Sequence, residues 1–149
     1  MLPSTLVYVW MAAKGPAVPT PKPQEVPKET AAPDDAGPPR EVPVHAIAIF
    51  DDCPPDQLSF TVGSLANAIE LGAPRYNAGD HVGCYRMYLG TATDLLSTLP
   101  ACTGVRSALV AGMVRASVLQ TYTERAWAMR DAFDGLLDAY QRKKKAAAP

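Results

Sequence analysis

The prolines of this chain divide it into two parts. Ten of the 15 prolines come before residue 46, and the other five are spread over residues 46–149. Repeated proline fixes φ and removes backbone donors, which excludes helix and central strand from residues 15–45. That segment also has few large apolar residues to offset the entropy of ordering. We therefore expect residues 15–45 to be a disordered, extended linker, and residues 46–145 to carry the folded domain.

Residues 1–14 form a separate apolar segment at the N-terminus. The stretch from Leu6 to Ala13 is about as long as the apolar region of a signal peptide, but no positively charged start precedes it. It is far too short to span a bilayer, which takes roughly 20 residues. The segment is therefore either a degenerate signal or an apolar tail. Export, for example to a periplasm, stays as open as a cytoplasmic location.

The overall charge argues against a polyanion as partner, because 14 Lys and Arg balance 15 Asp and Glu to a formal net charge of -1. The basic run 142–145 fits a solvated last helical turn, where cations face the negative end of the helix dipole. A contact with phosphate or an anionic membrane is the alternative. Aromatic residues do not interleave with basic ones, so we expect no nucleic acid partner. Arg106 and Arg115 interrupt the most apolar stretch, so we expect no integral membrane span.

Apolar residues at spacings of three and four predict two helices in the first half of the domain. The first begins after Pro54-Pro55 and ends or bends near Pro74. Gly79 then supplies a turn, and Asp80 is suited to cap a second helix that stops at Pro100. The residues that define the buried faces are Leu58, Val62, Leu65, Ile69 and Ala73, followed by Cys84, Tyr85, Tyr88, Ala92, Leu95, Leu96 and Leu99.

The second half predicts two more helices. Residues 103–119 are apolar on a broad surface, which indicates a central helix packed closely on its neighbours. Thr121 and Glu124 fit a capping sequence that breaks this helix and starts the last one, over about 124–144. A single uninterrupted helix over 103–144 is the alternative. Four helices joined by short turns predict an all-α fold, a small antiparallel helical bundle behind the proline-rich segment.

A short apolar stretch, residues 42–50, precedes the first helix. No second strand candidate exists for it to pair with, so we interpret it as an extended lead-in. We expect it to lay Ile47, Ile49 and Phe50 on the helical core. His45 lies in this stretch, and we interpret it as a surface histidine rather than a ligand.

A Leu-Gly pair, a glycine-containing turn, a small residue and an aromatic residue follow one another over residues of about 68–96: Leu71-Gly72, Tyr76-Asn77, Gly79-Asp80, Cys84 and Tyr88. With these residues the segment resembles a single tetratricopeptide helix–turn–helix, and the resemblance implies a helical hairpin. It departs from the family pattern by lacking the leading tryptophan and the closing proline, and by placing Pro74 inside the first helix. Because a lone repeat cannot bury its own face, peptide binding does not carry over.

The chain has three cysteines, Cys53, Cys84 and Cys102. An odd count fits three free thiols in a reducing compartment, or one disulfide and one buried thiol in an oxidising one. Cys53 and Cys102 each sit beside a proline-marked boundary, so they are the pair expected if a disulfide exists. Cys84 is interpreted as a small apolar residue of the core.

No motif in the sequence indicates catalysis. His81 and Cys84 lie three residues apart on one helix face, but tetrahedral zinc needs two more ligands that nothing brings near. A thiol nucleophile, Cys84 with His81 or His45, lacks the third group that orients such a base. We therefore predict no catalytic residue, no cofactor and no metal. Four aromatic residues remain as candidates for a groove or partner face, although a core role is commoner: Tyr76, Tyr85, Tyr88 and Trp127.

These observations favour a non-catalytic helical protein–protein interaction module on a flexible tether, with an unidentified protein partner. Two alternatives stay open. One is a small thiol- or metal-binding protein that uses His81 and Cys84. The other is a structural helical protein that associates with itself.

Overall fold

The computed structural model describes residues 37–148, so residues 1–14 and residues 15–36 of the expected linker lie outside the described part. The described residues form a short 3₁₀ helix followed by four α-helices, with no strand among them. The all-α prediction is therefore confirmed. The elements are η1 (Ile47–Phe50), α1 (Pro55–Asn77), α2 (His81–Thr98), α3 (Thr103–Val118) and α4 (Tyr122–Ala147).

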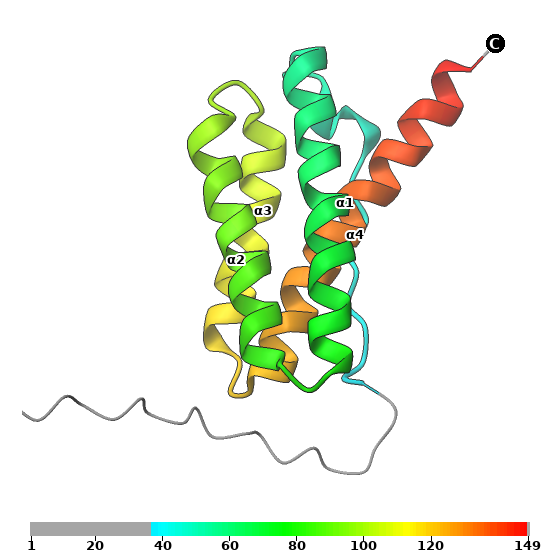
Figure 1. The fold of residues 1–149 in the computed structure, drawn as a ribbon. Helices are drawn as coiled ribbons and strands as arrows, with labels where there is room; N and C mark the ends of the chain where they lie inside the picture. Colours follow the sequence, from blue (N-terminus) through cyan, green and yellow to red (C-terminus); the bar gives the residue numbers. More distant parts are fainter. Residues whose placement is uncertain (1–36, 149) are drawn as a thin grey trace, which may run out of the picture.

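Successive helices run in opposite directions, so the fold is an up-and-down bundle (Figure 1). α1 and α2 form one hairpin, α3 and α4 form a second, and α4 also packs against α1, α2 and η1. In α4 nine residues between Ala126 and Ala139 are buried. The prediction that residues 103–119 form the central helix is wrong, because α4 holds that position and α3 covers it from one side. Apolarity on all sides of a helix does not reveal which side a neighbour covers.

The turn between α1 and α2 follows local rules that the sequence displays. Gly79 has a φ of 84°, a left-handed conformation that glycine adopts without cost. The Asp80 carboxylate then accepts a hydrogen bond of 2.8 Å from the backbone N–H of Gly83 and caps α2. Pro74 lies in the exposed last turn of α1, which ends three residues later. The helix therefore tolerates the missing donor close to its end.

The break between α3 and α4 is a full capping box. The Thr121 side chain accepts from the backbone N–H of Glu124, and the Glu124 carboxylate accepts from the backbone N–H of Thr121. Two otherwise unpaired donors at the start of α4 are thereby satisfied. The prediction of two helices in place of one over residues 103–144 is confirmed.

Residues 37–46, which we call the arm, lie along α4 and run in the same direction (Figure 1). Arg40 pairs with Asp131 and Asp134, and the guanidinium of Arg142 donates to the carbonyl of His45. Residues 37–45 fall within the range expected to form a linker. Here they cover the side of α4 that the other helices leave open.

The arm ends in η1, so the expected extended lead-in finishes as one turn of 3₁₀ helix. Phe50 is buried and its ring meets Tyr140 edge-on at 6.2 Å, and Ile49 packs against the core. Ile47, expected on the core, is 40% exposed. A turn directs only part of its residues inward, which a pattern of alternating apolar residues does not show.

Candidate functional site

Three of the four aromatic candidates gather where the α1–α2 turn meets the start of α4. The indole N–H of Trp127 donates to the hydroxyl of Tyr76 at 2.9 Å, and Tyr88 packs edge-on against Phe133 below them. Tyr85 does not join this cluster, because its ring packs against Tyr122 at 5.8 Å. The three clustered rings line one small cavity together with Ala73, Asn77, Cys84, Ala126 and Arg130.

This cavity has a volume of about 60 Å³. Pockets that hold small-molecule ligands usually enclose roughly 300–1,000 Å³, so it is too small for such a ligand. Its thiol and phenol groups also stay protonated at neutral pH. Burial raises the pKa of the Cys84 thiol, and burial raises the pKa of Tyr88 to about 12. Arg130 is held by Asp134 at 2.9 Å. The cavity therefore offers neither a thiolate nor a free cation.

His81 and Cys84 serve different neighbours in the structure. The His81 ring stacks on Tyr76 with 4.5 Å between centroids, and its Nδ1 lies 2.9 Å from the hydroxyl of Thr123. Cys84 is a buried free thiol of the core. Among residues 37–148, no three His, Cys, Asp or Glu side chains are grouped so that they could hold a metal ion. The pair therefore has no third ligand within that range.

His45 is a half-buried residue of the arm, so the interpretation of it as a surface residue is wrong. Its Nε2 is buried with no hydrogen-bond partner among the described residues. Burial lowers the pKa of His45, and the positive charge of Arg142 lowers it further. Both effects favour the neutral ring. We expect this side chain to act as a stability element of the arm rather than as a ligand.

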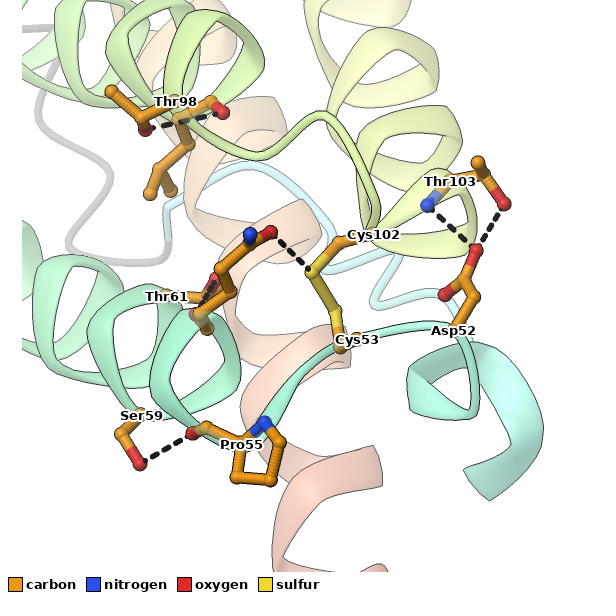
Figure 2. Close-up of a disulfide and its surroundings, with 10 residues drawn as sticks. Asp52, Cys53, Pro55, Ser59, Thr61, Thr98, Cys102 and Thr103 are labelled. Atoms are coloured by element: carbon orange, nitrogen blue, oxygen red, sulfur yellow. Dashed lines mark hydrogen bonds between the residues drawn. A yellow bond between two sulfur atoms is a disulfide. The ribbon is translucent and has the colours of Figure 1, made fainter.

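Cys53 and Cys102, the pair that the sequence singled out, are joined by a disulfide with 4.5 Å between their Cα atoms (Figure 2). The bond ties the start of α1 to the turn between α2 and α3. Beside it, the Asp52 carboxylate accepts hydrogen bonds from both the backbone N–H and the hydroxyl of Thr103. The Thr103 hydroxyl is the main reason that the pKa of Asp52 is lowered. Asp52 thus caps α3 from a distant part of the chain.

Asp131 is the buried charge that holds the arm in place. Its carboxylate pairs with Arg40 at 2.5 Å and with Arg115 at 3.3 Å, and it accepts from the backbone N–H of Glu41 at 2.9 Å. A buried carboxylate is tolerated only when it is paired in this way. All of its partners are supplied by the arm and by α3, so the network has a structural role.

The feature that sequence reasoning missed is an exposed apolar face on α3. Its three valines are 45%, 59% and 69% exposed, in chain order, and the two small residues between them are exposed as well. We call this set the valine face: Val110, Ala111, Val114, Ser117 and Val118. The valines recur at a spacing of four, within the broad apolar surface that residues 103–119 display. Because α3 is apolar on both sides, this spacing does not show which side stays exposed.

The arginines nearest to the valine face are each bonded to other parts of the protein. Arg106 donates to the carbonyl of Leu96 on α2, and Arg115 pairs with Asp131 and with Glu41. Arg125 donates to the carbonyl of Leu119. The face is therefore an uncharged strip between anchored arginines. An open groove of about 510 Å³ lies beside it, lined by Leu96, Thr103, Arg106, Ser107, Val110 and Ala111.

Within residues 37–148, no helix combines the length and the apolarity that crossing a membrane requires. α3, which carries the three exposed valines, also carries two arginines and packs on one side against α4.

Comparisons with known proteins assign the chain to no family. No family model matches the sequence, no curated protein is similar to it, and no solved structure matches its fold.

Proposed function

We propose that this protein is a non-catalytic helical interaction module that binds a protein partner through the valine face. The observation that carries the proposal is the exposure of Val110, Val114 and Val118 on one uncharged side of α3. Single exposed apolar residues are ordinary, but a contiguous strip marks a site of contact. A helix that is apolar all round is expected to be buried on all sides.

The hydrogen bonding of the valine face also favours burial against a partner. The hydroxyl of Ser117 donates to the carbonyl of Val114 at 2.7 Å, so this side chain already has an acceptor. Burying a polar group is costly only when its hydrogen bond is lost. Covering the face would therefore remove the valine side chains from water and leave the Ser117 hydroxyl with its hydrogen bond.

The α1–α2 hairpin supports the finer, tetratricopeptide-like interpretation only in its geometry. Gly72 of α1 lies against the ring of Tyr88 on α2, Gly79 makes the turn, and Cys84 is buried between the two helices. These are the offsets that the resemblance rests on. We propose a tetratricopeptide-like hairpin on that basis, and we place the binding surface on α3 instead.

The tether is part of the same proposal, and the arm refines its boundary. The proline-rich composition favours a spacer before residue 37, whereas Arg40 and Pro43 contact α4. A variant that tests the tether should therefore begin at residue 37. Such a variant keeps the arm and removes the proposed spacer together with the apolar segment of residues 1–14.

Photo-crosslinking in the cells that produce the protein tests the proposed surface. Benzoylphenylalanine is placed at position 114 of the full chain, and in a matched control at position 93, where Thr93 is exposed on α2. We expect a protein adduct from position 114 and a much weaker one from position 93. Adducts from position 93 alone, or none from either position, would overturn the proposed function.

A further inference from the structure

The geometry points to a second copy of this chain as the partner of the valine face, packed antiparallel about a two-fold axis at Val114. This inference rests on the proposed function, because both use the same face. It commits to one partner, so another protein on this face would contradict it.

The residues of the valine face are arranged symmetrically about Val114. Val110 and Val118 lie four residues before and after it, and Ala111 and Ser117 lie three residues before and after it. An antiparallel copy related by a two-fold axis at Val114 therefore sets Val110 against Val118 of the second copy. It also sets Ala111 against Ser117, and Val114 against itself. A two-fold interface needs such a self-complementary surface.

The two ends of the valine face are polar. Ser107, seven residues before Val114, is exposed on α3, and at the other end α3 stops at Val118, with exposed Gln120 and Thr121 beyond the helix. A polar rim around an apolar centre is the usual anatomy of an interface.

The valine face presents no charge, so charge does not oppose the approach of a second copy. The flanking arginines, Arg106 and Arg115, are bonded on opposite sides of α3, to α2 and to the arm with α4. Two copies therefore meet without like charges opposed at the centre. The small side chains at 111 and 117 allow the two helices to approach closely, and antiparallel helices align their dipoles favourably.

The size of the contact sets its strength. From Ser107 to the end of α3 at Val118 the paired segment is roughly 17 Å long at 1.5 Å per residue. One helix face per copy is small beside a stable dimer interface, so the dimer is reversible and depends on concentration.

A charge-swap experiment tests the two-fold axis in the full chain. Wild-type protein is expected to form a dimer that sedimentation velocity detects as the concentration rises. Val114→Arg alone and Val114→Glu alone should each weaken it roughly tenfold or more, because like charges then oppose each other across the axis. An equal mixture of the two variants should restore the dimer. Thr93→Arg, on the exposed side of α2, is the matched control and should leave it unchanged.

Cysteine pairs test the register independently. Val114→Cys should be joined to itself by a short bis-maleimide, whereas Val110→Cys and Val118→Cys should each react well only when mixed with the other. The wild-type chain is the control, since its one free thiol, Cys84, is buried. Self-linking of Val110→Cys at the same rate would place the axis elsewhere and overturn the inference.

The remaining outcomes separate this inference from the proposed function. If wild-type protein stays monomeric while position 114 crosslinks to a different protein, the second copy is ruled out and the interaction module stands. If a dimer forms and Val114→Arg leaves it intact, another surface makes it and the inference fails. If position 114 contacts no protein at all, both ideas fail.

Discussion

Asp131, which binds the arm, and His45, which belongs to it, differ in how their buried polar atoms are satisfied. Asp131 is a charge that is buried but fully paired, with Arg40, Arg115 and the backbone N–H of Glu41. His45 is a neutral ring whose buried Nε2 has no partner among the described residues. The paired charge offsets its desolvation. The unpaired nitrogen is tolerated only while it stays uncharged, which links the docking of the arm to pH.

The pKa of His45 gives the first prediction at this scale. In the unfolded chain a histidine binds a proton near pH 6.5, while the folded protein binds it only at lower pH. The unfolded state therefore holds more protons below about 6.5, and the stability that the neutral ring contributes is present above that pH. We expect the free energy of unfolding to fall as the pH drops from 7 to 5, measured by urea denaturation.

His45→Gln is the matched variant, because it removes the titrating ring and leaves every other ionisable group in place. The fall between pH 7 and 5 should be smaller in this variant than in the wild type. The carboxylates with lowered pKa values, Asp52 and Glu124, lose protons below this range and do not confuse the comparison. If the free energy of unfolding fell equally with pH in the two proteins, His45 would not be the cause of the fall.

At the scale of elements, the α1–α2 contact depends on a glycine. A Cβ added at Gly72 would collide with the ring of Tyr88, which is itself buried against Phe133. At Gly63, on the exposed side of the same helix, a Cβ meets nothing within 4 Å. The two positions share a helix and differ only in what they face.

Gly72→Ala and Gly63→Ala are therefore expected to act in opposite directions. Overpacking at Gly72 should cost about 1–3 kcal/mol of stability. Alanine at Gly63 should add about 0.5–1 kcal/mol, because glycine loses more backbone entropy in a helix. Chemical denaturation of both variants measures the difference. A stabilising Gly72→Ala would show that the two helices lie further apart than described.

The elements that the sequence predicted well are those set by neighbours in the chain. Gly79 and Asp80 determine the α1–α2 turn within four residues, and Thr121 with Glu124 determines the start of α4 within three. The arm was not predictable in this way. Its anchor pairs Arg40 with Asp131, which are 91 residues apart, and no local pattern links them.

The same limit explains which parts of the candidate site the sequence revealed. Tyr76, Tyr88 and Trp127 share a cavity, whereas Tyr85 packs elsewhere. The spacing of apolar residues separates the buried side of a helix from its exposed side only where the helix is apolar on one side. α3 is apolar on both sides. Which side α4 covers depends on tertiary packing, so the valine face became visible only in the structure.

At the scale of the whole molecule, the disulfide joins cysteines that are 49 positions apart and closes a loop that contains α1 and α2. Cross-linking reduces the entropy of the unfolded chain, which predicts a contribution of about 2–4 kcal/mol for loops of this kind. We expect the double variant Cys53→Ala, Cys102→Ala to lose that much in a urea titration. Adding a reductant should then weaken the wild type and leave the double variant unchanged.

Alkylation followed by intact mass supplies the control for this experiment. The native chain should take up almost no reagent, because Cys84 is buried and burial raises its pKa. The unfolded, unreduced chain should take up one equivalent, and the unfolded, reduced chain three. Three equivalents without reduction would show that the protein does not carry the disulfide.

The central place of α4 governs the order in which the molecule can assemble. The arm is among the first of the described residues to be synthesised, and α4, on which it lies, is the last helix. The arm therefore cannot dock until α4 has been synthesised. The disulfide is different, since both cysteines have emerged before α4 begins at Tyr122. The disulfide can thus form before synthesis is complete, but the core can pack only after α4 has been synthesised.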